Sequence, residues 1–550
     1  MNTASKPMYD WGTIPWTKVQ REVFKLQKRI YRASLRGDKR TMRKLQRLLI
    51  KSWYGRLLAV RRVTQDNRGR KTPGIDGVVV IDPKKKLELA QTIRLEGEPQ
   101  PVKRVYIPKP GNQQEKRPLG IPVIRDRAEE AVVKLALEPE WEAKFEANSY
   151  GFRPGRGCHD AIEAIFDSLR KPKYVLDADI RQCFDRIDHD QLLKKLDTFP
   201  LIQRRIKGWL KAGVMEGDVF YSSDYGTPQG GICSPLLANI ALHGLEKDIA
   251  AAFPARKTVK GRHICWKPQI IRYADDFVIL HHDAPSIEMA RNLAEDWLEK
   301  MGLELKPEKT KLVHTVNCLT QEKPGFDFLG FTIRQFPQGK KEKDSSEDAR
   351  VKRIIKPSKK AIARHIDKLR SIIHKHRSSA QATLIYALNP VIRGWCNYYS
   401  TVVSKKTFGK IEHVVFQMLW AWAKRRHPKK SKHWIYERYW IRHKGVLVFK
   451  DEDSPPLFGH KDTPIQRHIK VQKVRSPFDG DWLYWGARMG RYPGLDEKVA
   501  EALKKQQCKC AICGLYFTEM DLPNFATITT EDRLQIKRLI HSHCKQKKRQ

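Results

Sequence analysis

The sequence predicts an α+β protein in which helical regions flank a central domain of mixed strands and helices. Near the N-terminus, apolar residues such as Val19, Val23 and Leu26 recur at intervals of three and four, as on one face of a helix. Residues 61–335 contain short runs rich in β-branched residues, which alternate with helical stretches and with turns containing glycine and proline. Helical periodicity returns after residue 353 and continues to about residue 445.

The composition predicts a nucleic-acid partner. The chain has 550 residues, enough for several domains, and a formal net charge of +44. A charge of this size repels itself unless a polyanion such as nucleic acid neutralises it. We expect no membrane contact, because the longest uncharged run, 226–245, contains two prolines, and the N-terminus lacks the apolar core of a secretion signal. Most cysteines are single, which predicts reduced thiols in a cytoplasmic compartment, either bacterial cytoplasm or an organelle matrix.

Changes in composition divide the chain into five expected regions. The first is basic and helical, and we expect its basic faces to contact RNA. The second alternates strands and helices, and the third is helical after a charged segment, 338–353, that we expect to form an exposed loop or linker. The fourth is irregular and aromatic, and the last is a small basic tail with clustered cysteines. The expected regions are residues 1–60, 61–337, 338–445, 446–505 and 506–550.

Two adjacent carboxylates interrupt an apolar segment in the middle of the chain. Asp275 and Asp276 lie between the runs IIRY and FVIL, which predict the two strands of a hairpin. Adjacent acids at a turn are commonly just solvated, so this pair alone does not define a site. A second predicted strand, 174–180, carries Asp177 and Asp179. If the strands are neighbours, Asp179 lies beside the pair, whereas we expect Asp177 to be structural or at the surface.

Three carboxylates on neighbouring strands can hold divalent metal ions. Their hard oxygen ligands suit Mg²⁺, which also binds substrate phosphates. Two ions held in this way stabilise the attacking 3′-oxygen and the leaving pyrophosphate of an in-line phosphoryl transfer. In so basic a chain, Asp179, Asp275 and Asp276 therefore predict the catalytic residues and magnesium ligands of a nucleotidyl polymerase.

Further sequence blocks resemble one protein family. The blocks, in order, are YIPKPGNQQEKRPLGIP, NSYGFRPGRGC, LDADIRQCFDRIDH, GTPQGGICSPLLANIAL, RYADDF, GLELKPEKTKLVH and GFDFLGFTIR. Together they resemble the reverse transcriptases of the group II intron maturase family. LNPVIRGWCNYYS at 388–400 is similar to the family's thumb or maturase domain, and SPFDGDWLYWGARMGR at 476–491 is similar to its DNA-binding region. The resemblance implies a right-hand polymerase with fingers and palm in 61–337 and a thumb in 338–445.

The same resemblance implies roles for residues that bind the incoming nucleotide. Phe184, five residues after Asp179, matches the aromatic residue beneath the sugar, where a ring would clash with a 2′-hydroxyl and favour deoxynucleotides. Gln229 matches a residue that lines the nucleotide pocket. Lys109 and Arg117 match cations that bind the triphosphate, on either side of what is expected to be a somewhat long loop.

Several residues are candidates for contact with RNA or DNA. Arg393 and Asn397 lie one helical turn apart, whereas the aromatic residues around them are expected to form core. Lys309 either contacts primer or template or is simply solvated. A basic run without acids is expected to bind phosphates and begins with Lys424, Arg425 and Arg426. Two alternatives stay open for Trp482, Tyr484 and Trp485, which could stack on bases or form a small core.

The tail contains a spacing typical of zinc sites. Cys510 and Cys513 are separated by two residues, and Cys544 with His541 or His543 could complete one structural zinc site. The opening CKCAICG resembles the HNH endonuclease domain found at this place in many family members. Residues 514–540 contain no histidine that could serve as the general base, so we expect no DNA endonuclease activity.

The predicted function is RNA-directed DNA synthesis combined with binding of the group II intron RNA, to assist splicing and retrohoming into a target DNA, with dNTPs as substrates. One alternative is an RNA-binding maturase that assists splicing while its polymerase is idle, and the intact acidic set argues against it. Another is a reverse transcriptase of a different bacterial retroelement, which the long thumb and C-terminal extension disfavour.

Overall fold

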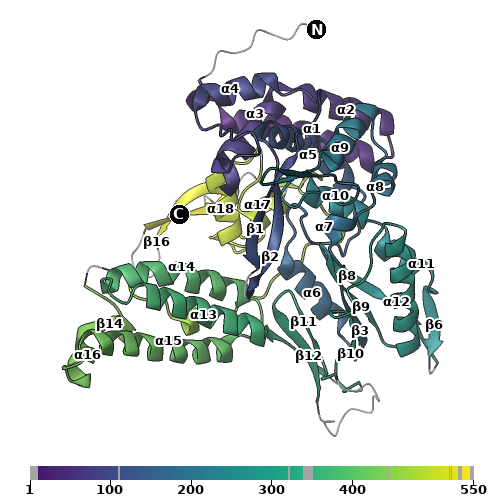
Figure 1. Ribbon diagram of the computed structural model, residues 1–550. Coiled ribbons are helices and arrows are strands. Elements are labelled where there is room, and N and C mark those ends of the chain that lie inside the picture. The colour runs from purple at the N-terminus through teal and green to yellow at the C-terminus, as the bar shows by residue number, and fades with distance from the viewer. Residues whose placement is uncertain are drawn as a thin grey trace.

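The computed structural model describes residues 10–109, 112–259, 261–319, 322–338, 351–443, 445–452, 454–518, 521, 523–529 and 535–544. Figure 1 shows a group of N-terminal helices, two sheets with their covering helices, and a separate layer of long helices. Within these ranges every helix is too short or too polar to cross a bilayer.

The N-terminal helices pack on the long helix α5 (Ile124–Glu142). The predicted apolar face is buried, and Gly37 takes a left-handed φ of +71° where the first helix ends. Asp38 then caps the second helix by accepting a hydrogen bond from the Thr41 amide at 3.0 Å. The expected boundary after residue 60 falls inside a continuous helical segment. The elements are η1 (Trp11–Thr13), α1 (Trp16–Leu35), α2 (Lys39–Lys51), α3 (Trp53–Arg61), η2 (Arg62–Asp66), η3 (Arg68–Lys71) and α4 (Pro83–Thr92).

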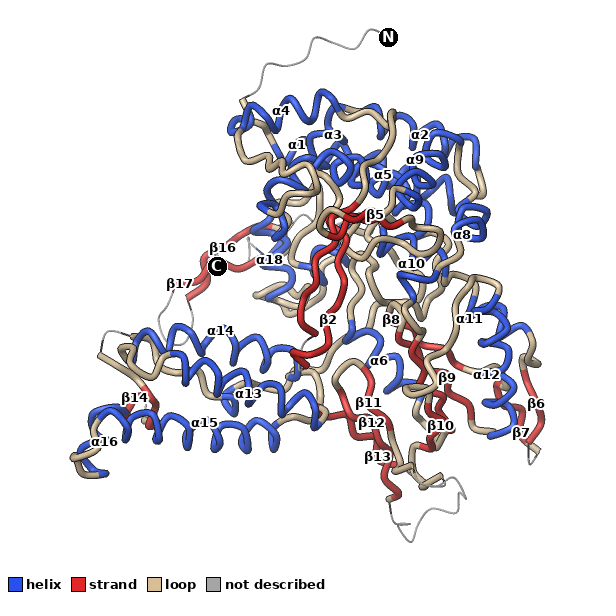
Figure 2. The backbone as a smooth tube through the Cα atoms, viewed as in Figure 1, coloured by secondary structure: helices blue, strands red, loops and turns tan. Residues whose placement is uncertain are grey.

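The first sheet has the strand order β2-β1-β4-β5 and is dominated by a long hairpin (Figure 2). Its strands are β1 (Val102–Lys109), β2 (Asn112–Ile121), β4 (Val214–Glu216) and β5 (Val219–Tyr221). Because Lys109 already pairs with Asn112, the expected long loop is wrong: most of that segment continues the hairpin. Helix α9 (Pro200–Lys211) leads into β4.

The second sheet has the order β10-β3-β9-β8 and is buried on both faces. Along β9, Phe277 and Ile279 face one apolar core while Val278 and Leu280 face another, so the alternation of a strand serves two cores. Its strands are β3 (Tyr174–Asp179), β8 (Gln269–Tyr273), β9 (Asp276–His281) and β10 (Lys311–His314). The accompanying elements are α6 (Cys158–Ser168), α7 (Cys183–Arg186), α8 (His189–Leu196), α10 (Ser234–Ala241), α11 (Leu245–Ala251), α12 (Ala284–Glu299) and the hairpin β6 (Arg256–Val259) and β7 (Arg262–Cys265).

A small sheet connects the second sheet to the layer of long helices. Its strands are β11 (Phe326–Phe328), β12 (Phe331–Pro337) and β13 (Val351–Pro357). Residues 351–353 therefore belong to a strand that pairs with β12, and the expectation of a loop there is wrong; residues 339–350 lie outside the described residues. The layer comprises α13 (Lys359–Lys375), α14 (Gln381–Tyr399), α15 (Lys405–Arg426), α16 (Lys432–Tyr439), β14 (Trp440–His443) and β15 (Val446–Phe449).

The C-terminal region packs back onto the start of α6. Trp485 is fully buried, and a Cβ on Gly155 would lie 2.4 Å from its ring, so glycine is required at this contact. Asp160 accepts hydrogen bonds from the Val471 amide at 2.7 Å and from Arg488. Trp482, Tyr484 and Trp485 were expected either to stack on bases or to form a small core, and Trp485 forms core. The elements are η4 (His460–Asp462), α17 (Trp482–Met489), α18 (Glu497–Lys505), β16 (Asn524–Thr529) and β17 (Gln535–Ile540).

Candidate active site

The second sheet brings three of the predicted carboxylates together. β3 and β9 are antiparallel neighbours, and their register places Asp179 directly opposite Asp276. Asp275 lies in the tight turn between β8 and β9, one residue before this pair. Asp177 is half-buried two residues back on β3, opposite Val278, so it shares the face of Asp179.

Crowding of like charges changes the acidity of this cluster. Burial, followed by the charges of Asp275 and Asp179, raises the pKa of Asp276 to about 7. Burial and the charge of Asp179 also raise the pKa of Asp275, while Arg117 lowers it. Carboxylates that repel one another in a half-buried position need a cation to stay ionised together. The donor set, which consists of oxygen atoms alone, fits Mg²⁺.

Lys309 supplies one such cation in the structure. Its Nζ forms an ion pair with Oδ2 of Asp179, which raises the pKa of the lysine. The backbone of the same turn is joined to β3, because the Lys306 amide donates to the Asp179 carbonyl at 2.8 Å. In the structure the exposed ammonium of Lys309 thus binds the acidic cluster. Its contact with primer or template stays a prediction.

A buried arginine holds the turn that carries the acidic pair. Ala274 has a left-handed φ of +59°, which is strained for a residue with a side chain. Arg272 is buried and donates to the Ala274 carbonyl at 3.1 Å and to Oδ1 of Asn239 at 3.1 Å. Beneath the turn, a Cβ on Gly151 would lie 2.3 Å from the Ala274 amide nitrogen. Sequence reasoning did not single out these supporting residues, although Arg272 precedes the YADD residues directly.

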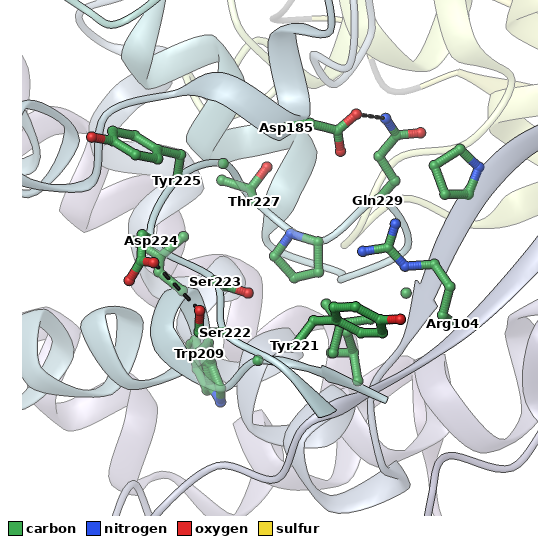
Figure 3. A pocket seen from close by; sticks show the side chains of 18 of the residues that line it. Arg104, Asp185, Trp209, Tyr221, Ser222, Ser223, Asp224, Tyr225, Thr227 and Gln229 are labelled. Atoms are coloured by element: carbon green, nitrogen blue, oxygen red, sulfur yellow. Dashed lines mark hydrogen bonds between the residues drawn. The ribbon is translucent and has the colours of Figure 1, made fainter. Parts of the chain in front are cut away.

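The residues predicted to bind the nucleotide come from four elements: α7, the loop before α10, and strands β1 and β2. Phe184 is half-buried in the short helix α7 and packs edge-to-face on Phe152, with ring centroids 6.0 Å apart. Gln229 lies in the loop before α10 and lines a cavity of about 510 Å³ (Figure 3). Arg117 is exposed on β2 and acts electrostatically on Asp275. Lys109 ends β1, and its side chain lies outside the described residues.

The predicted RNA-binding residues of the helical layer differ in solvent exposure and in their contacts within the protein. Arg393 and Asn397 are exposed on α14, and the Arg393 guanidinium lies 5.2 Å from the Phe458 ring. Lys424 and Arg425 are exposed in the last turn of α15. Arg426, in contrast, donates to the Ser379 carbonyl at 2.7 Å and lies over the Trp422 ring. These contacts attach the end of α15 to the turn between α13 and α14, and the contact of Arg426 with nucleic acid stays a prediction.

The aromatic residues of α14 form core, as expected. Trp395 stacks on His365 with ring centroids 4.5 Å apart and planes 8° apart. Tyr399 is buried, and the Tyr398 hydroxyl donates to the Leu329 carbonyl at 3.0 Å. The hydrogen bond of Tyr398 attaches the helical layer to the turn between β11 and β12 of the small sheet.

A second cluster of metal-binding side chains lies in the tail. Cys510, Cys513, His541 and Cys544 each offer one ligand atom, and these atoms all lie within 4.8 Å of one another. The sequence left open whether His541 or His543 is the fourth ligand, and His541 belongs to this cluster. The ring of His543 stacks on the ring of His541, with centroids 5.0 Å apart. Burial raises the pKa of the Cys510 thiol, but hydrogen bonds from backbone amides outweigh this and bring it to about 6. The hairpin β16–β17 delivers His541 to the cysteines.

Three segments of the chain match known family models. Residues 11–93 match the N-terminal domain of reverse transcriptase, and residues 107–333 match reverse transcriptase (RNA-dependent DNA polymerase). Residues 362–440 match the maturase-specific domain of group II introns. The matched segments cover the N-terminal helices, both sheets that surround the acidic cluster, and most of the helical layer.

Individual relatives extend the similarity over most of the chain. Protein YkfC of Escherichia coli (strain K12) is 33% identical over 314 residues, which cover 50% of this chain and 78% of YkfC. Group II intron-encoded protein LtrA of Lactococcus lactis subsp. cremoris is 28% identical over 516 residues, which cover 74% of this chain and 83% of LtrA. A solved telomerase structure from Candida albicans is similar at 13% identity and a TM-score of 0.34, over 62% of this chain and 61% of that chain, which is too distant to support any argument.

Proposed function

We propose that this chain, which belongs to the group II intron maturase family of reverse transcriptases, copies a group II intron RNA. The chain is an RNA-dependent DNA polymerase with a right-hand polymerase fold. It would also bind the intron RNA to assist its splicing and its return to DNA. One observation carries the catalytic part of this proposal. The β3–β9 register and the adjoining turn place three carboxylates, Asp179, Asp275 and Asp276, at one edge of a buried sheet.

We assign these three carboxylates as ligands of two Mg²⁺ ions. When bound, the ions would activate the primer 3′-oxygen and stabilise the leaving pyrophosphate. Burial, followed by the charges of Asp275 and Asp179, raises the pKa of Asp276, and a bound divalent cation would favour the ionised form. Lys309 would leave Asp179 on metal binding and become available to the primer or template phosphates. Arg272 would keep Asp275 and Asp276 in position from below through the Ala274 carbonyl.

The nucleotide would lie between the acidic cluster and the first sheet. Phe184 would lie beneath the sugar and exclude a 2′-hydroxyl, while Gln229 would line the pocket beside it. Arg117 and Lys109, on the two strands of the long hairpin, would bind the triphosphate as cations. The support for this arrangement is that backbone hydrogen bonds join α7, the loop at 226–229 and β2.

Intron RNA would bind along the basic N-terminal helices and the exposed face of the helical layer. Arg393, Asn397, Lys424 and Arg425 are the candidates with exposed side chains. The region at 446–505, which packs on α6, would contact target DNA. We propose cytoplasm or an organelle matrix as the location, because the thiols are free and intron transcripts are made in those compartments. As functional regions we keep the five expected ranges; helix α3 crosses the boundary after residue 60, and the boundary after residue 445 falls between β14 and β15.

We further propose that Cys510, Cys513, His541 and Cys544 hold one structural zinc ion. Three sulfurs and one nitrogen within 4.8 Å of one another form a Cys₃His donor set, which suits tetrahedral zinc. All four positions are occupied by protein side chains, so such a site leaves no position for substrate. This supports a tail that is held together by zinc and does not cut DNA.

The alternative of a maturase with an idle polymerase is tested at the acidic cluster. Asp275→Asn should reduce primer extension on an RNA template by about a hundredfold to a thousandfold or more, because it removes a ligand of the metal ions that would stabilise the transition state. RNA affinity should stay unchanged, because the basic surfaces are untouched. Asp296→Asn, the same change at an exposed position on α12, is the matched control. Extension by Asp275→Asn at the rate of this control would refute the metal assignment.

A further inference from the structure

An acid that the proposed mechanism does not use holds the side chain of Gln229. Nε2 of Gln229 donates a hydrogen bond to Oδ2 of Asp185 at 3.0 Å. An ionised carboxylate only accepts hydrogen bonds, so the amide must turn its nitrogen toward Asp185 and its oxygen away. Figure 3 shows this orientation, with the Gln229 oxygen on the side opposite Asp185.

The backbone that carries Gln229 is fixed on both sides. Toward α7, the Thr227 amide donates to the Phe184 carbonyl at 2.5 Å. Toward β2, the Gln229 carbonyl accepts from the Gly120 amide at 2.7 Å. The loop is thereby held between the residue proposed to face the sugar and the strand that carries Arg117.

Gly226 brings this loop directly against Asp185. It has a φ of +82°, and a Cβ at this position would lie 2.5 Å from the Asp185 carbonyl carbon, so a larger residue cannot fit. The Gly226 amide also donates to the Ile187 carbonyl at 2.8 Å, which holds the loop against the segment that carries Asp185. The distance between the Asp185 carboxylate and the Gln229 amide is set in advance by the fold.

The hydrogen bond contributes little to stability where it lies. Asp185 is exposed and Gln229 half-buried at the wall of the open 510 Å³ cavity. A solvent-exposed hydrogen bond adds little to the free energy of folding, because water replaces either partner. What the bond does determine is the direction in which the amide of Gln229 presents its acceptor oxygen.

We propose that Asp185 is a positioning residue, which orients the Gln229 amide so that its oxygen accepts a hydrogen bond from the sugar of the incoming nucleotide. A 2′-deoxynucleotide has one free sugar hydroxyl, at the 3′ position, so the partner of this oxygen is the 3′-hydroxyl. The inference rests on the proposed function, in which Gln229 lines the nucleotide pocket. Beyond that function, it explains why the Gln229 amide has one orientation. It also identifies the 3′-hydroxyl as the group that the amide oxygen binds.

The experiment measures kcat and KM for a dNTP and for the corresponding 2′,3′-dideoxynucleotide in primer extension on an RNA template. The variants are Asp185→Ala, Asp185→Asn, Gln229→Ala and the double variant of the two alanine changes. Asp296→Ala is the control, because Asp296 is exposed on α12 and does not line this cavity. Thermal unfolding of each variant verifies that the fold is intact.

We expect Asp185→Ala to raise the KM for the dNTP about threefold to tenfold, the factor of one hydrogen bond, with little change in kcat. Asp185→Asn should have a smaller effect, since its amide can still accept but no longer enforces the orientation. The KM for the dideoxynucleotide should not change, because that substrate lacks the hydroxyl. In the Gln229→Ala background, the Asp185 substitution should add nothing.

Two results would overturn the inference while leaving the polymerase assignment intact. One is an equal rise in KM for both nucleotides, which would show that Asp185 acts on another part of the substrate. The other is an additive effect in the double variant, which would show that Asp185 acts independently of Gln229. If instead Gln229→Ala leaves the KM for the dNTP unchanged, the proposed pocket role of Gln229 is wrong, and the inference fails with it.

Discussion

The palm and the tail each gather metal-binding side chains, but they do so with opposite chemistry. The palm cluster consists of carboxylates on two paired strands, with a lysine beside them. The tail cluster consists of three cysteines and one histidine, within 4.8 Å of one another. Carboxylates hold hard ions loosely and leave coordination positions for substrate phosphates, whereas four soft or borderline ligands enclose an ion completely. The comparison separates a site built to react from a site built to hold a fold together.

The two sites also differ in what supports them. The turn at Asp275 rests on a buried arginine and on a glycine that admits close backbone contact, so its geometry is fixed before any ion arrives. The tail cluster joins the turn at 510–513 to the end of β17, and its small apolar core is made of few residues. A small core of this kind commonly depends on a metal for stability. Loss of metal should therefore affect activity at the first site and local folding at the second.

Removal of magnesium should produce the largest effect and separate the two sites. Without magnesium, primer extension should stop, and added magnesium should restore it in full, because the palm is folded without the ions. A zinc chelator at constant magnesium should release one zinc per chain while extension continues. Metal analysis and extension assays on the same samples measure both. Extension that depends on the zinc, or a palm that unfolds without magnesium, would break the comparison.

Phe184→Ala should change the choice of substrate at the palm without changing its metal chemistry. Removal of the ring opens space beside the sugar, so discrimination against ribonucleotides should fall, by up to about a hundredfold. Single-nucleotide incorporation of matched rNTP and dNTP measures the ratio. Phe152→Ala removes the partner of the same edge-to-face pair and serves as the control for lost packing. An unchanged ratio in Phe184→Ala would reduce this residue to core packing.

Cys544→Ser should act on the tail and leave the palm nearly untouched. The thiolate is one of four expected ligands, so zinc content should fall below one per chain and proteolysis should reach the tail faster. Extension should stay within about twofold of the wild type, because the tail and the palm share no ligand. Cys508→Ser is the matched control, since Cys508 lies near the cluster but outside it. If Cys508→Ser lost as much zinc as Cys544→Ser, the assignment of Cys544 as a zinc ligand would be wrong.

The sequence predicted the palm well because its signals are local. Short apolar runs rich in β-branched residues predict β3, β8 and β9, and the two acids between IIRY and FVIL lie at the predicted turn of the hairpin. Neighbouring strands then leave few ways to arrange Asp179 and Asp276. The family resemblance added the order of the elements, and the comparisons with known families confirm the reverse transcriptase fold.

Other features depend on contacts that no local pattern records. The ion pair of Lys309 with Asp179 and the hydrogen bond of Asp185 with Gln229 join residues 130 and 44 positions apart. Arg426 looks like part of a basic run, yet its guanidinium donates to the Ser379 carbonyl in the turn between α13 and α14. Strand β13 was missed because its partner lies across a charged segment, which by composition alone resembles a linker. In each case the residue type alone allows several roles, and contacts with distant parts of the chain decide which role the residue has.

The smallest expected effect is none at all: the tail should not cut the second strand of the target DNA. General-base hydrolysis needs a histidine within hydrogen-bond reach of a water beside the scissile phosphate. His541 is buried, with its Nδ1 3.3 Å from the Cys513 sulfur, and is thus committed to the cysteine cluster. His543 stacks on it and is the remaining histidine of the tail.

The test incubates the protein–intron complex with end-labelled double-stranded target and magnesium. We expect no protein-dependent nick on the strand opposite the insertion site, and no difference between the wild type and His543→Ala. DNA synthesis would then need a primer from elsewhere, such as a nascent strand at a replication fork. A nick that disappears in His543→Ala would show that the tail is a reacting site. The contrast between a catalytic palm and a purely structural tail would then be wrong.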